Sequence, residues 1–347
     1  MTYDFVLFYK KEGRFLCIMT MEKRRFDVCA LTVRMRSGIL FTEARENRGG
    51  DGMKTEHCTL CPRQCGAVRS KAPGRCGAGA RAKVARAAKH LWEEPCISGS
   101  RGSGTVFFSG CELGCVFCQN RDISRGNFGR EVTEKRLAEI FLELQAQAVH
   151  NINLVTPLQY TPQILSALEL AGEELTLPVV VNCGGYARVE TLQRWQGKAD
   201  VWLPDLKYCS SELSARYSGA ADYFDYATKA ILEMYRQQPK LVWNEDGTLR
   251  QGLIVRHLIL PGAWKDSLKL LEWLDGALPK DGFLLSLMRQ YTPNAACADY
   301  PEINRKLTTF EYQKVLDRAG ELGFQGFSQE AGSAKGEYTP PFDLTGV

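Results

Sequence analysis

Three cysteines in the first half of the chain have the spacing of a metal-cluster loop. Cys111, Cys115 and Cys118 follow one another as C-x3-C-x2-C. A 4Fe–4S cube normally takes four thiolates, so three of them leave one iron open to an outside ligand, as a catalytic metal keeps an open position. The other interpretation is a structural zinc or cluster site that takes its fourth ligand from elsewhere. We favour the open catalytic cluster.

A second group of cysteines lies nearer the N-terminus. Cys58, Cys61, Cys65 and Cys76 are spaced C-x2-C-x3-C-x10-C, which suits either a tetrahedral zinc ion or a complete 4Fe–4S cluster. Neighbouring Gly and Pro residues let the backbone wrap closely around a metal. The sequence therefore predicts a second metal site, zinc or iron–sulfur, with Cys96 as an alternative ligand. We interpret the remaining cysteines as scattered thiols: Cys17, Cys29, Cys183, Cys209 and Cys297.

The positive charge of the chain is concentrated around this second group. Residues 53–90 carry nine Lys or Arg and one acid, a net charge of +8, whereas the whole chain is only +4. Such a segment is either a solvated basic face or a dock for an acidic protein or for nucleic-acid phosphates. An acidic flavodoxin- or ferredoxin-like reductant would fit it, and nucleic acid is the less favoured partner.

The number and setting of the cysteines bear on the compartment. The chain has 347 residues and 13 Cys, and it shows neither a signal peptide nor an apolar run long enough to span a membrane. An odd Cys count without an export signal argues against a secreted disulfide framework. We expect a cytoplasmic protein without a membrane partner, whose clustered thiols serve metal or redox chemistry.

The elements that must position the triple-Cys group follow a strand–helix alternation. Continuous apolar runs predict buried strands at 105–109, 152–155, 178–182, 200–204, 253–260, 283–287 and 324–328. Amphipathic stretches between them predict helices at 134–148, 162–171, 221–237 and 308–322. This pattern indicates an α/β fold, a partial (β/α) TIM-like barrel, in which active-site residues gather at the carboxyl ends of the strands. Residues 241–252 are expected to form an inserted hairpin turning at Asp246-Gly247.

We divide the chain into four segments. Residues 1–52 lack a helical or alternating period and end in a Gly-rich stretch, so we expect translation to start at Met53 and this segment to be a doubtful N-terminal extension. Residues 53–100 form the basic, Cys-rich metal-binding module. Residues 101–330 form the barrel, and 331–347 a C-terminal tail.

The triple-Cys motif resembles a known superfamily. C-x3-C-x-aromatic-C after the first strand of an α/β barrel is similar to the radical S-adenosylmethionine (radical SAM) superfamily. The resemblance implies a cluster whose open iron chelates the amino and carboxylate groups of S-adenosylmethionine. It also implies reductive cleavage of that cofactor to a 5′-deoxyadenosyl radical that abstracts hydrogen.

Other segments are similar to one branch of the superfamily, the glycyl-radical-enzyme activases, such as pyruvate formate-lyase activating enzymes. The similar segments are Cys118–Asp122, Asn182–Tyr186, Leu203–Lys207 and Val255–Gly262. The likeness implies that Phe117 packs near the adenine and that three polar residues contact the cofactor or a peptide substrate: Asn182, Lys207 and Arg256.

Two features depart from that pattern. Thr156-Pro157-Leu158-Gln159 stands where the superfamily commonly has Gly-Gly-Glu for the methionine amino group. Activases with auxiliary clusters carry those cysteines after the triple-Cys loop, whereas here they precede it. The activase assignment is therefore weaker than that of the superfamily.

We expect a radical SAM enzyme whose substrate is a protein, either a glycyl-radical enzyme or a peptide. A rival within enzymology is radical modification of RNA or of a ribosomally made peptide. A rival from another class is a non-catalytic zinc or iron–sulfur protein for electron transfer or scaffolding.

Overall fold

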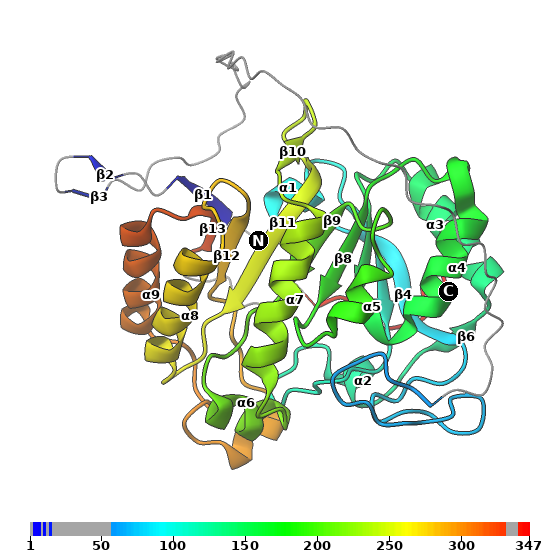
Figure 1. The fold of residues 1–347 in the computed structure, drawn as a ribbon, viewed down its shortest axis with the longest axis horizontal. Helices are drawn as coiled ribbons and strands as arrows, with labels where there is room; N and C mark the ends of the chain where they lie inside the picture. Colours follow the sequence, from blue (N-terminus) through cyan, green and yellow to red (C-terminus); the bar gives the residue numbers. More distant parts are fainter. Residues whose placement is uncertain (1–2, 8–9, 12–13, 16–56, 331–338) are drawn as a thin grey trace, which may run out of the picture.

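The computed structural model describes residues 3–7, 10–11, 14–15, 57–330 and 339–347 (Figure 1). The expectation about Met53 and the residues Cys17 and Cys29 lie outside this part of the chain. Residues Tyr3–Leu7 form β1, and Lys10–Lys11 (β2) pairs with Arg14–Phe15 (β3). Among the described residues, no helix is long and apolar enough to cross a membrane.

A twisted sheet of largely parallel strands forms the centre of the molecule. Its order is β1-β13-β12-β11-β9-β8-β7-β5-β4-β6, and β10 pairs with β11 on one side. The run from β5 to β13 is parallel, and the flanking strands β1, β4 and β6 are antiparallel. The parallel strands are β5 (Ser103–Phe108), β7 (Ile152–Val155), β8 (Val179–Cys183), β9 (Val201–Pro204), β11 (Leu249–Leu258), β12 (Leu284–Met288) and β13 (Gln325–Gln329). The antiparallel strands are β4 (Ala82–His90), β6 (Arg130–Val132) and β10 (Val242–Trp243).

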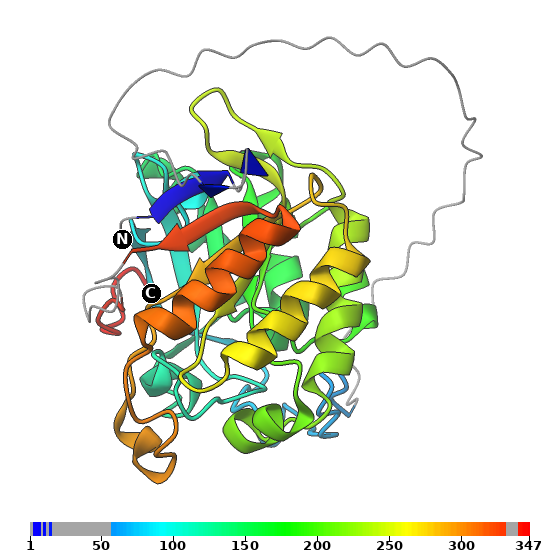
Figure 2. The same cartoon turned by 90° about the vertical axis from the view of Figure 1, so that its left-hand side faces the viewer.

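Helices cover the outer face of this sheet and close its core. Every residue of β5, β7, β8, β9 and β12 is buried, as continuous apolar runs require. Figure 2 shows α8 and α9 side by side over the β11–β13 part of the sheet. The longer helices are α3 (Glu134–Ala146), α4 (Thr161–Ala171), α6 (Ser211–Ser218), α7 (Tyr223–Gln237), α8 (Trp264–Ala277) and α9 (Thr309–Leu322). Shorter ones are α1 (Pro95–Ser98), α2 (Arg121–Ser124) and α5 (Val189–Gln193).

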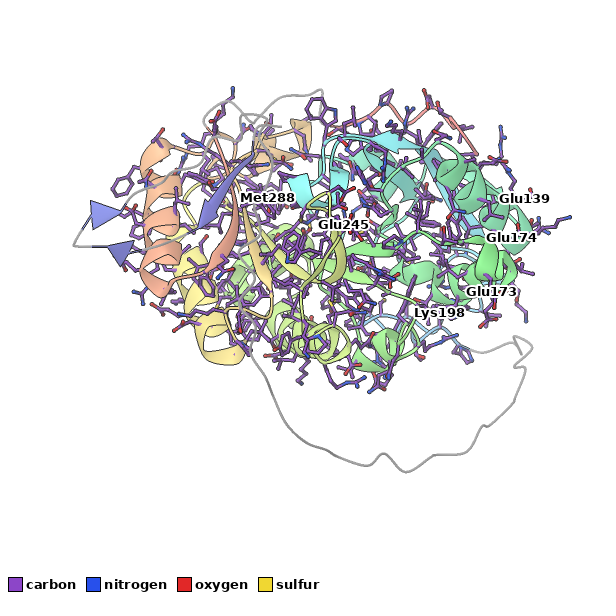
Figure 3. The ribbon with its side chains drawn as sticks, turned by 90° about the horizontal axis from the view of Figure 1, so that it is seen from above. Glu139, Glu173, Glu174, Lys198, Glu245 and Met288 are labelled. Carbon is purple, nitrogen blue, oxygen red and sulfur yellow. The ribbon has the colours of Figure 1, made fainter. Side chains whose placement is uncertain are left out.

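The outside of the helical layer is charged. Seen from above, Glu139, Glu173 and Glu174 lie at its outer edge (Figure 3). All three are exposed, whereas Met288 at the end of β12 is buried. The helix faces thus separate water from core as an amphipathic pattern predicts.

Local sequence explains how the helices begin. Thr308 accepts the backbone N–H of Glu311, and the Glu311 carboxylate accepts the backbone N–H of Thr308, which forms a capping box at the start of α9. Thr133 caps α3 and Ser210 caps α6 in the same side-chain manner.

The expected barrel is confirmed, and its predicted strands and helices lie within a few residues of the observed ones. The hairpin is also as expected, since the turn at Asp246-Gly247 joins β10 to β11. The sequence did not predict β4, which pairs with β5. Its Ala, Arg and Lys residues do not form the continuous apolar run by which the other strands were predicted. The predicted module at 53–100 thus includes a strand of the barrel sheet, and its cysteines lie in the preceding loop.

Candidate functional site

The loop that carries the triple-Cys motif leaves the carboxyl end of β5. We call residues 110–120 the triple-Cys loop. Gly110 has φ +85°, and a Cβ there would collide with the carbonyl oxygen of Cys76. Gly114 has φ +59°, and its carbonyl accepts two hydrogen bonds from Arg125 at 3.0 and 2.6 Å. These backbone positions need glycine, and they fix where the three thiols lie.

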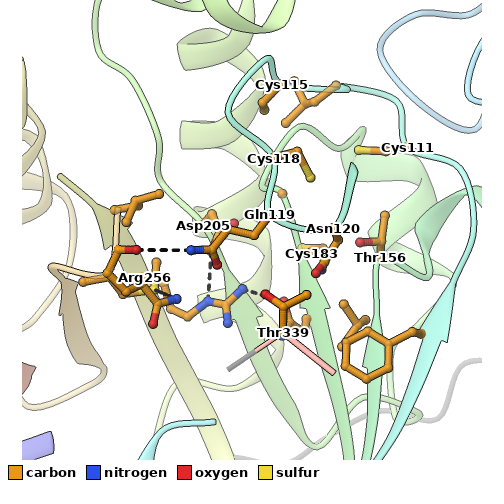
Figure 4. A pocket seen from close by; sticks show the side chains of 18 of the residues that line it. Cys111, Cys115, Cys118, Gln119, Asn120, Thr156, Cys183, Asp205, Arg256 and Thr339 are labelled. Atoms are coloured by element: carbon orange, nitrogen blue, oxygen red, sulfur yellow. Dashed lines mark hydrogen bonds and ion pairs between the residues drawn. The ribbon is translucent and has the colours of Figure 1, made fainter. Parts of the chain in front are cut away.

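Cys111, Cys115 and Cys118 line one pocket (Figure 4). Hydroxyl groups donate to two of the sulfurs, from Ser218 to Cys115 Sγ at 2.9 Å and from Ser124 to Cys118 Sγ at 3.3 Å. Burial raises the pKa of Cys111 and Cys118, and the charges of the neighbouring thiols raise it further. Three sulfurs that share one pocket, two of which accept hydrogen bonds from hydroxyl groups, fit the ligand set of a cluster with one open iron.

A buried network of charged side chains forms another part of the pocket wall. Arg256 on β11 donates to Asp205 Oδ1 at 2.9 Å and to Asn182 Oδ1 at 2.6 Å, and its guanidinium is 3.4 Å from Glu93 Oε2. Lys207 Nζ lies 2.5 Å from Asp205 Oδ2. The network thus pairs two acidic side chains, Asp205 and Glu93, with two basic ones, Arg256 and Lys207, because buried charges need partners of opposite sign.

The network fixes the ionisation of its members. Burial alone would raise the pKa of Asp205, but Arg256 and Lys207 outweigh it and the pKa is lowered. Burial would lower the pKa of Lys207, but the charge of Asp205 outweighs it and the pKa is raised. Both groups therefore stay charged at neutral pH.

Sequence reasoning missed Glu93, the second acid of this network. It follows β4, and its carboxylate accepts hydrogen bonds from Asn153 at 3.0 Å and Asn182 at 3.4 Å. Burial raises its pKa, and Arg256 and Asn153 oppose the rise. No local motif marks Glu93, because its partners come from β7, β8 and β11.

The other residues implied by the resemblance also line this pocket. Phe117, Asn182, Lys207 and Arg256 all belong to its wall. Phe117 is buried among Tyr208, Tyr217 and Tyr291, with ring centroids 5.9 to 6.4 Å away. Whether it contacts an adenine stays a prediction.

The segment that replaces Gly-Gly-Glu is divided between the pocket and the core. Thr156 lines the pocket with φ +56°. Gln159 instead donates to the carbonyls of Ser109 and Gly110 at 3.3 and 3.1 Å, which supports the base of the triple-Cys loop. Thr156 is therefore the member of this segment that can meet a ligand.

The C-terminal tail completes the pocket, which the sequence did not suggest. Thr339 and Pro340 line it. The Phe342 ring packs on Phe107 with centroids 5.5 Å apart, and Asp343 pairs with Arg86 at 2.7 Å. The tail is thus fastened along β4 and covers a side of the partial barrel.

The four other cysteines of interest come together in residues 57–81, which we call the four-Cys loop. Burial raises the pKa of Cys61, and the nearby thiols of Cys76 and Cys58 also raise it. A Cβ on Gly74 would be 3.4 Å from Cys65 Sγ and 3.7 Å from Cys76 Sγ. Cys58 and Cys76 are buried, Cys61 is half-buried, and Cys65 is exposed. The backbone N–H groups of Arg75 and Ala67 outweigh burial and lower the pKa of Cys65.

In the part of the chain that the structure describes, no three His, Cys, Asp or Glu side chains converge on one point as they would around a single metal ion. A zinc ion draws its sulfurs to about 2.3 Å from one centre. A cube instead carries each Cys on its own iron, which spaces the sulfurs more widely.

Several other residues of the barrel and of α1 can also be placed. His257 is a buried, hydrogen-bonded residue of the barrel, with Nδ1 2.6 Å from Leu206 O and Nε2 2.8 Å from Ser267 Oγ. Gln329 accepts the backbone N–H groups of Arg289 and Gln290 and so caps a loop. Cys96 lies on α1 in a separate apolar cluster with Ile97 and Val180, and Cys183, interpreted as a scattered thiol, lines the pocket.

Comparisons with known proteins agree with the cluster loop. The profile of a 4Fe-4S single cluster domain matches residues 98–203. The uncharacterized protein MJ0674 of Methanocaldococcus jannaschii is 31% identical over 276 residues, which cover 76% of this chain and 74% of that protein.

Solved structures resemble the chain more distantly. SuiB of Streptococcus suis bound to S-adenosylmethionine is 14% identical, with a TM-score of 0.44 over 67% of this chain, which spans 51% of SuiB. Methylornithine synthase is 16% identical, with a TM-score of 0.45 over 64% of this chain and 63% of that one. A domain of a pyruvate-formate lyase-activating enzyme from Bacteroides vulgatus is 15% identical, with a TM-score of 0.37 over 50% of this chain and 94% of the domain.

The identity to the M. jannaschii protein extends over about three quarters of both chains, and the matched 4Fe–4S domain includes the triple-Cys loop. The chain therefore belongs to the same family as that protein.

Proposed function

We propose that the chain is an enzyme that binds a 4Fe–4S cluster through Cys111, Cys115 and Cys118 and cleaves S-adenosylmethionine reductively in the adjoining pocket. The observation that carries this proposal is the placement of three thiols and the Asp205–Lys207–Arg256 network in one pocket. When bound, the cluster supplies the electron that splits the sulfonium into methionine and a 5′-deoxyadenosyl radical.

The protein's own residues position the cofactor and exclude water. Cys111, Cys115 and Cys118 would hold the cluster and would leave one iron free for the amino and carboxylate groups of the methionine moiety. Asn182, Lys207 and Arg256 offer hydrogen-bond donors from the ends of neighbouring strands, where a barrel gathers its active-site residues. The tail at Thr339 and Pro340 narrows the pocket, which protects a radical from solvent.

The test is a triple replacement of the cluster ligands. Wild-type protein and the Cys111→Ala/Cys115→Ala/Cys118→Ala variant are reconstituted anaerobically, reduced with dithionite and assayed for 5′-deoxyadenosine. We expect product from the wild type and none from the variant. Equal product from both would remove the proposed site.

As to the substrate, we propose that the radical abstracts hydrogen from a partner protein, at a glycine of a glycyl-radical enzyme. Support comes from the strand-end segments Asn182–Tyr186 and Val255–Gly262, which resemble those of the activases. The purified partner should acquire a glycyl radical, seen by electron paramagnetic resonance, only in the presence of this chain and S-adenosylmethionine. A radical-free partner under conditions of active cofactor cleavage would contradict this assignment.

Modification of RNA remains the second candidate, because the basic charge of the four-Cys loop favours it. The structure weakens that support, since Arg63, Arg69 and Lys83 bond to carbonyl oxygens within the chain. Lys71, Arg75 and Arg81 remain exposed and can meet an acidic partner such as a flavodoxin-like donor. RNA binding that falls steeply with salt would favour the second candidate.

A further inference from the structure

The four-Cys loop and the triple-Cys loop touch through their ligand residues. The backbone N–H of Cys111 donates to the carbonyl oxygen of Cys76 at 3.0 Å. Gly110 is held against the same carbonyl, and its lack of a side chain permits the approach. From Cys76 Sγ to Cys111 Sγ the path consists of covalent bonds interrupted by one hydrogen bond.

The four-Cys loop reaches from this contact to the surface. Cys76 is buried at the contact, whereas Cys65 is exposed and accepts the backbone N–H of Arg75, whose side chain is also exposed. In the triple-Cys loop no thiol is exposed, since Cys115 is buried and Cys111 and Cys118 are half-buried. A centre held by the four-Cys loop would therefore stand between solvent and the catalytic pocket.

The chemistry of the loop suits iron and sulfide. Four thiols complete the ligand set of a cube without an open position. Backbone N–H groups of Arg63, Ala67 and Ala78 point at the sulfurs of Cys61, Cys65 and Cys76, and such hydrogen bonds tune cluster potentials.

We propose that Cys58, Cys61, Cys65 and Cys76 bind a second 4Fe–4S cluster, which relays electrons from an external donor to the cluster on the triple-Cys loop. The relay rests on the proposed function, since it feeds that cluster. A low-potential one-electron carrier protein is oxidised by one electron at the Cys65 face. The second cluster accepts this electron and passes it on across the Cys76–Cys111 contact, and no bond or proton changes in the transfer.

Metal content tests the site. Full-length protein, isolated without oxygen, should contain about eight irons and eight sulfides per chain and no stoichiometric zinc. The Cys58→Ala/Cys61→Ala variant should lose half of both, and the control Cys209→Ala, in neither group, should lose none. One zinc with four irons in the wild type, or full iron in the double variant, would overturn the proposal.

Donor dependence tests the relay. Dithionite is small enough to reduce the catalytic cluster directly, whereas a flavodoxin must use the surface. The double variant should keep dithionite-driven cleavage of S-adenosylmethionine and lose flavodoxin-driven cleavage to the level seen without donor. Equal loss with both donors, or retention of both, would overturn the relay. If the wild type fails to cleave with dithionite, the proposed function itself fails.

A single variant covers the case in which the double variant does not fold. Cys65→Ala removes one exposed ligand and leaves the buried thiols in place. Its paramagnetic resonance spectrum should lose or change one of two cluster signals, while the signal that responds to S-adenosylmethionine is kept. Two unchanged signals would contradict ligation by Cys65.

Discussion

At the scale of single residues, Arg256 organises the pocket. Its planar guanidinium reaches Asp205, Asn182 and Glu93 from three directions, which a point charge cannot do. Asp205 in turn orients Lys207. The geometry of the polar wall therefore depends on the planar shape of the Arg256 side chain more than on its positive charge.

Arg256→Lys should keep the charge but lose this geometry. We expect reductive cleavage of S-adenosylmethionine to fall by about tenfold or more in kcat/KM, equivalent to at least about 1.4 kcal/mol of transition-state stabilisation. The measurement is dithionite-driven formation of 5′-deoxyadenosine at varied cofactor concentration. Arg318→Lys on the surface of α9 is the control, and an equal rate in both variants would show that the wall does not position the cofactor.

At the scale of elements, the tail and the short helix α1 are additions to the partial barrel. Phe342 covers Phe107, and Leu344 and Ala87 hydrogen-bond the tail to β4 through the backbone. Glu94 follows the carboxyl end of β4, precedes α1 and is almost fully buried. Both features lie outside the repeated strand–helix units and are held by tertiary contacts.

Phe342→Ala should loosen the tail. Removing a ring that packs edge to face on Phe107 should cost about 1–3 kcal/mol of stability. We also expect faster loss of cluster absorbance on exposure to air, because the wall at Thr339 and Pro340 opens. Phe310→Ala, which removes a 60% exposed ring from α9, is the matched control. If the tail does not seal the pocket, cluster absorbance should be lost at the same rate in both variants.

Glu94 should make the stability depend on pH. Burial raises its pKa from the ordinary 4.5 to about 7. Between these values the folded chain holds a proton that the unfolded chain has released, so this group's contribution to stability falls as pH rises from 4.5 to 7 and stays low above. Glu94→Gln should therefore stabilise the protein at pH 8 by about 1–3 kcal/mol and change little at pH 4.5. Denaturant midpoints at both values, compared with exposed Glu245→Gln, measure this, and a gain independent of pH would contradict it.

Whether a site residue could be predicted from the sequence depends on whether neighbouring residues or residues distant in the chain place it in the pocket. Cys111, Lys207 and Arg256 are marked by local spacing or by their place at the end of an apolar run, and the structure brings them to one pocket. Glu93 and Thr339 become pocket residues only because β4 and the tail pack beside strands distant in sequence. Their neighbours along the chain carry no sign of that packing.

At the scale of the whole molecule, the four-Cys loop is fastened to the barrel largely by side chains donating to carbonyl groups. In Figure 1 it lies at the end of the barrel where α2 and α6 also lie. Arg63 donates to the carbonyls of Glu112, Ser218 and Gly219 at 3.1, 2.9 and 2.5 Å, and Arg188 and Thr191 donate to carbonyls within the loop. One basic side chain thus ties the loop both to the triple-Cys loop and to the end of α6.

Arg63→Met should separate the loop from the barrel while keeping a side chain of similar length. Three carbonyl groups lose a charged donor, and hydrogen bonds to charged groups contribute about 1.5–3 kcal/mol each, less where exposed. We expect faster hydrogen exchange across residues 57–81 and slower flavodoxin-driven cleavage, with dithionite-driven cleavage retained. Arg81→Met removes an exposed arginine from the same loop and should change neither. The Cys76–Cys111 contact depends on the loop staying docked. Normal hydrogen exchange with impaired flavodoxin-driven cleavage would contradict docking by Arg63. Rapid hydrogen exchange with normal flavodoxin-driven cleavage would contradict the electron path through that contact.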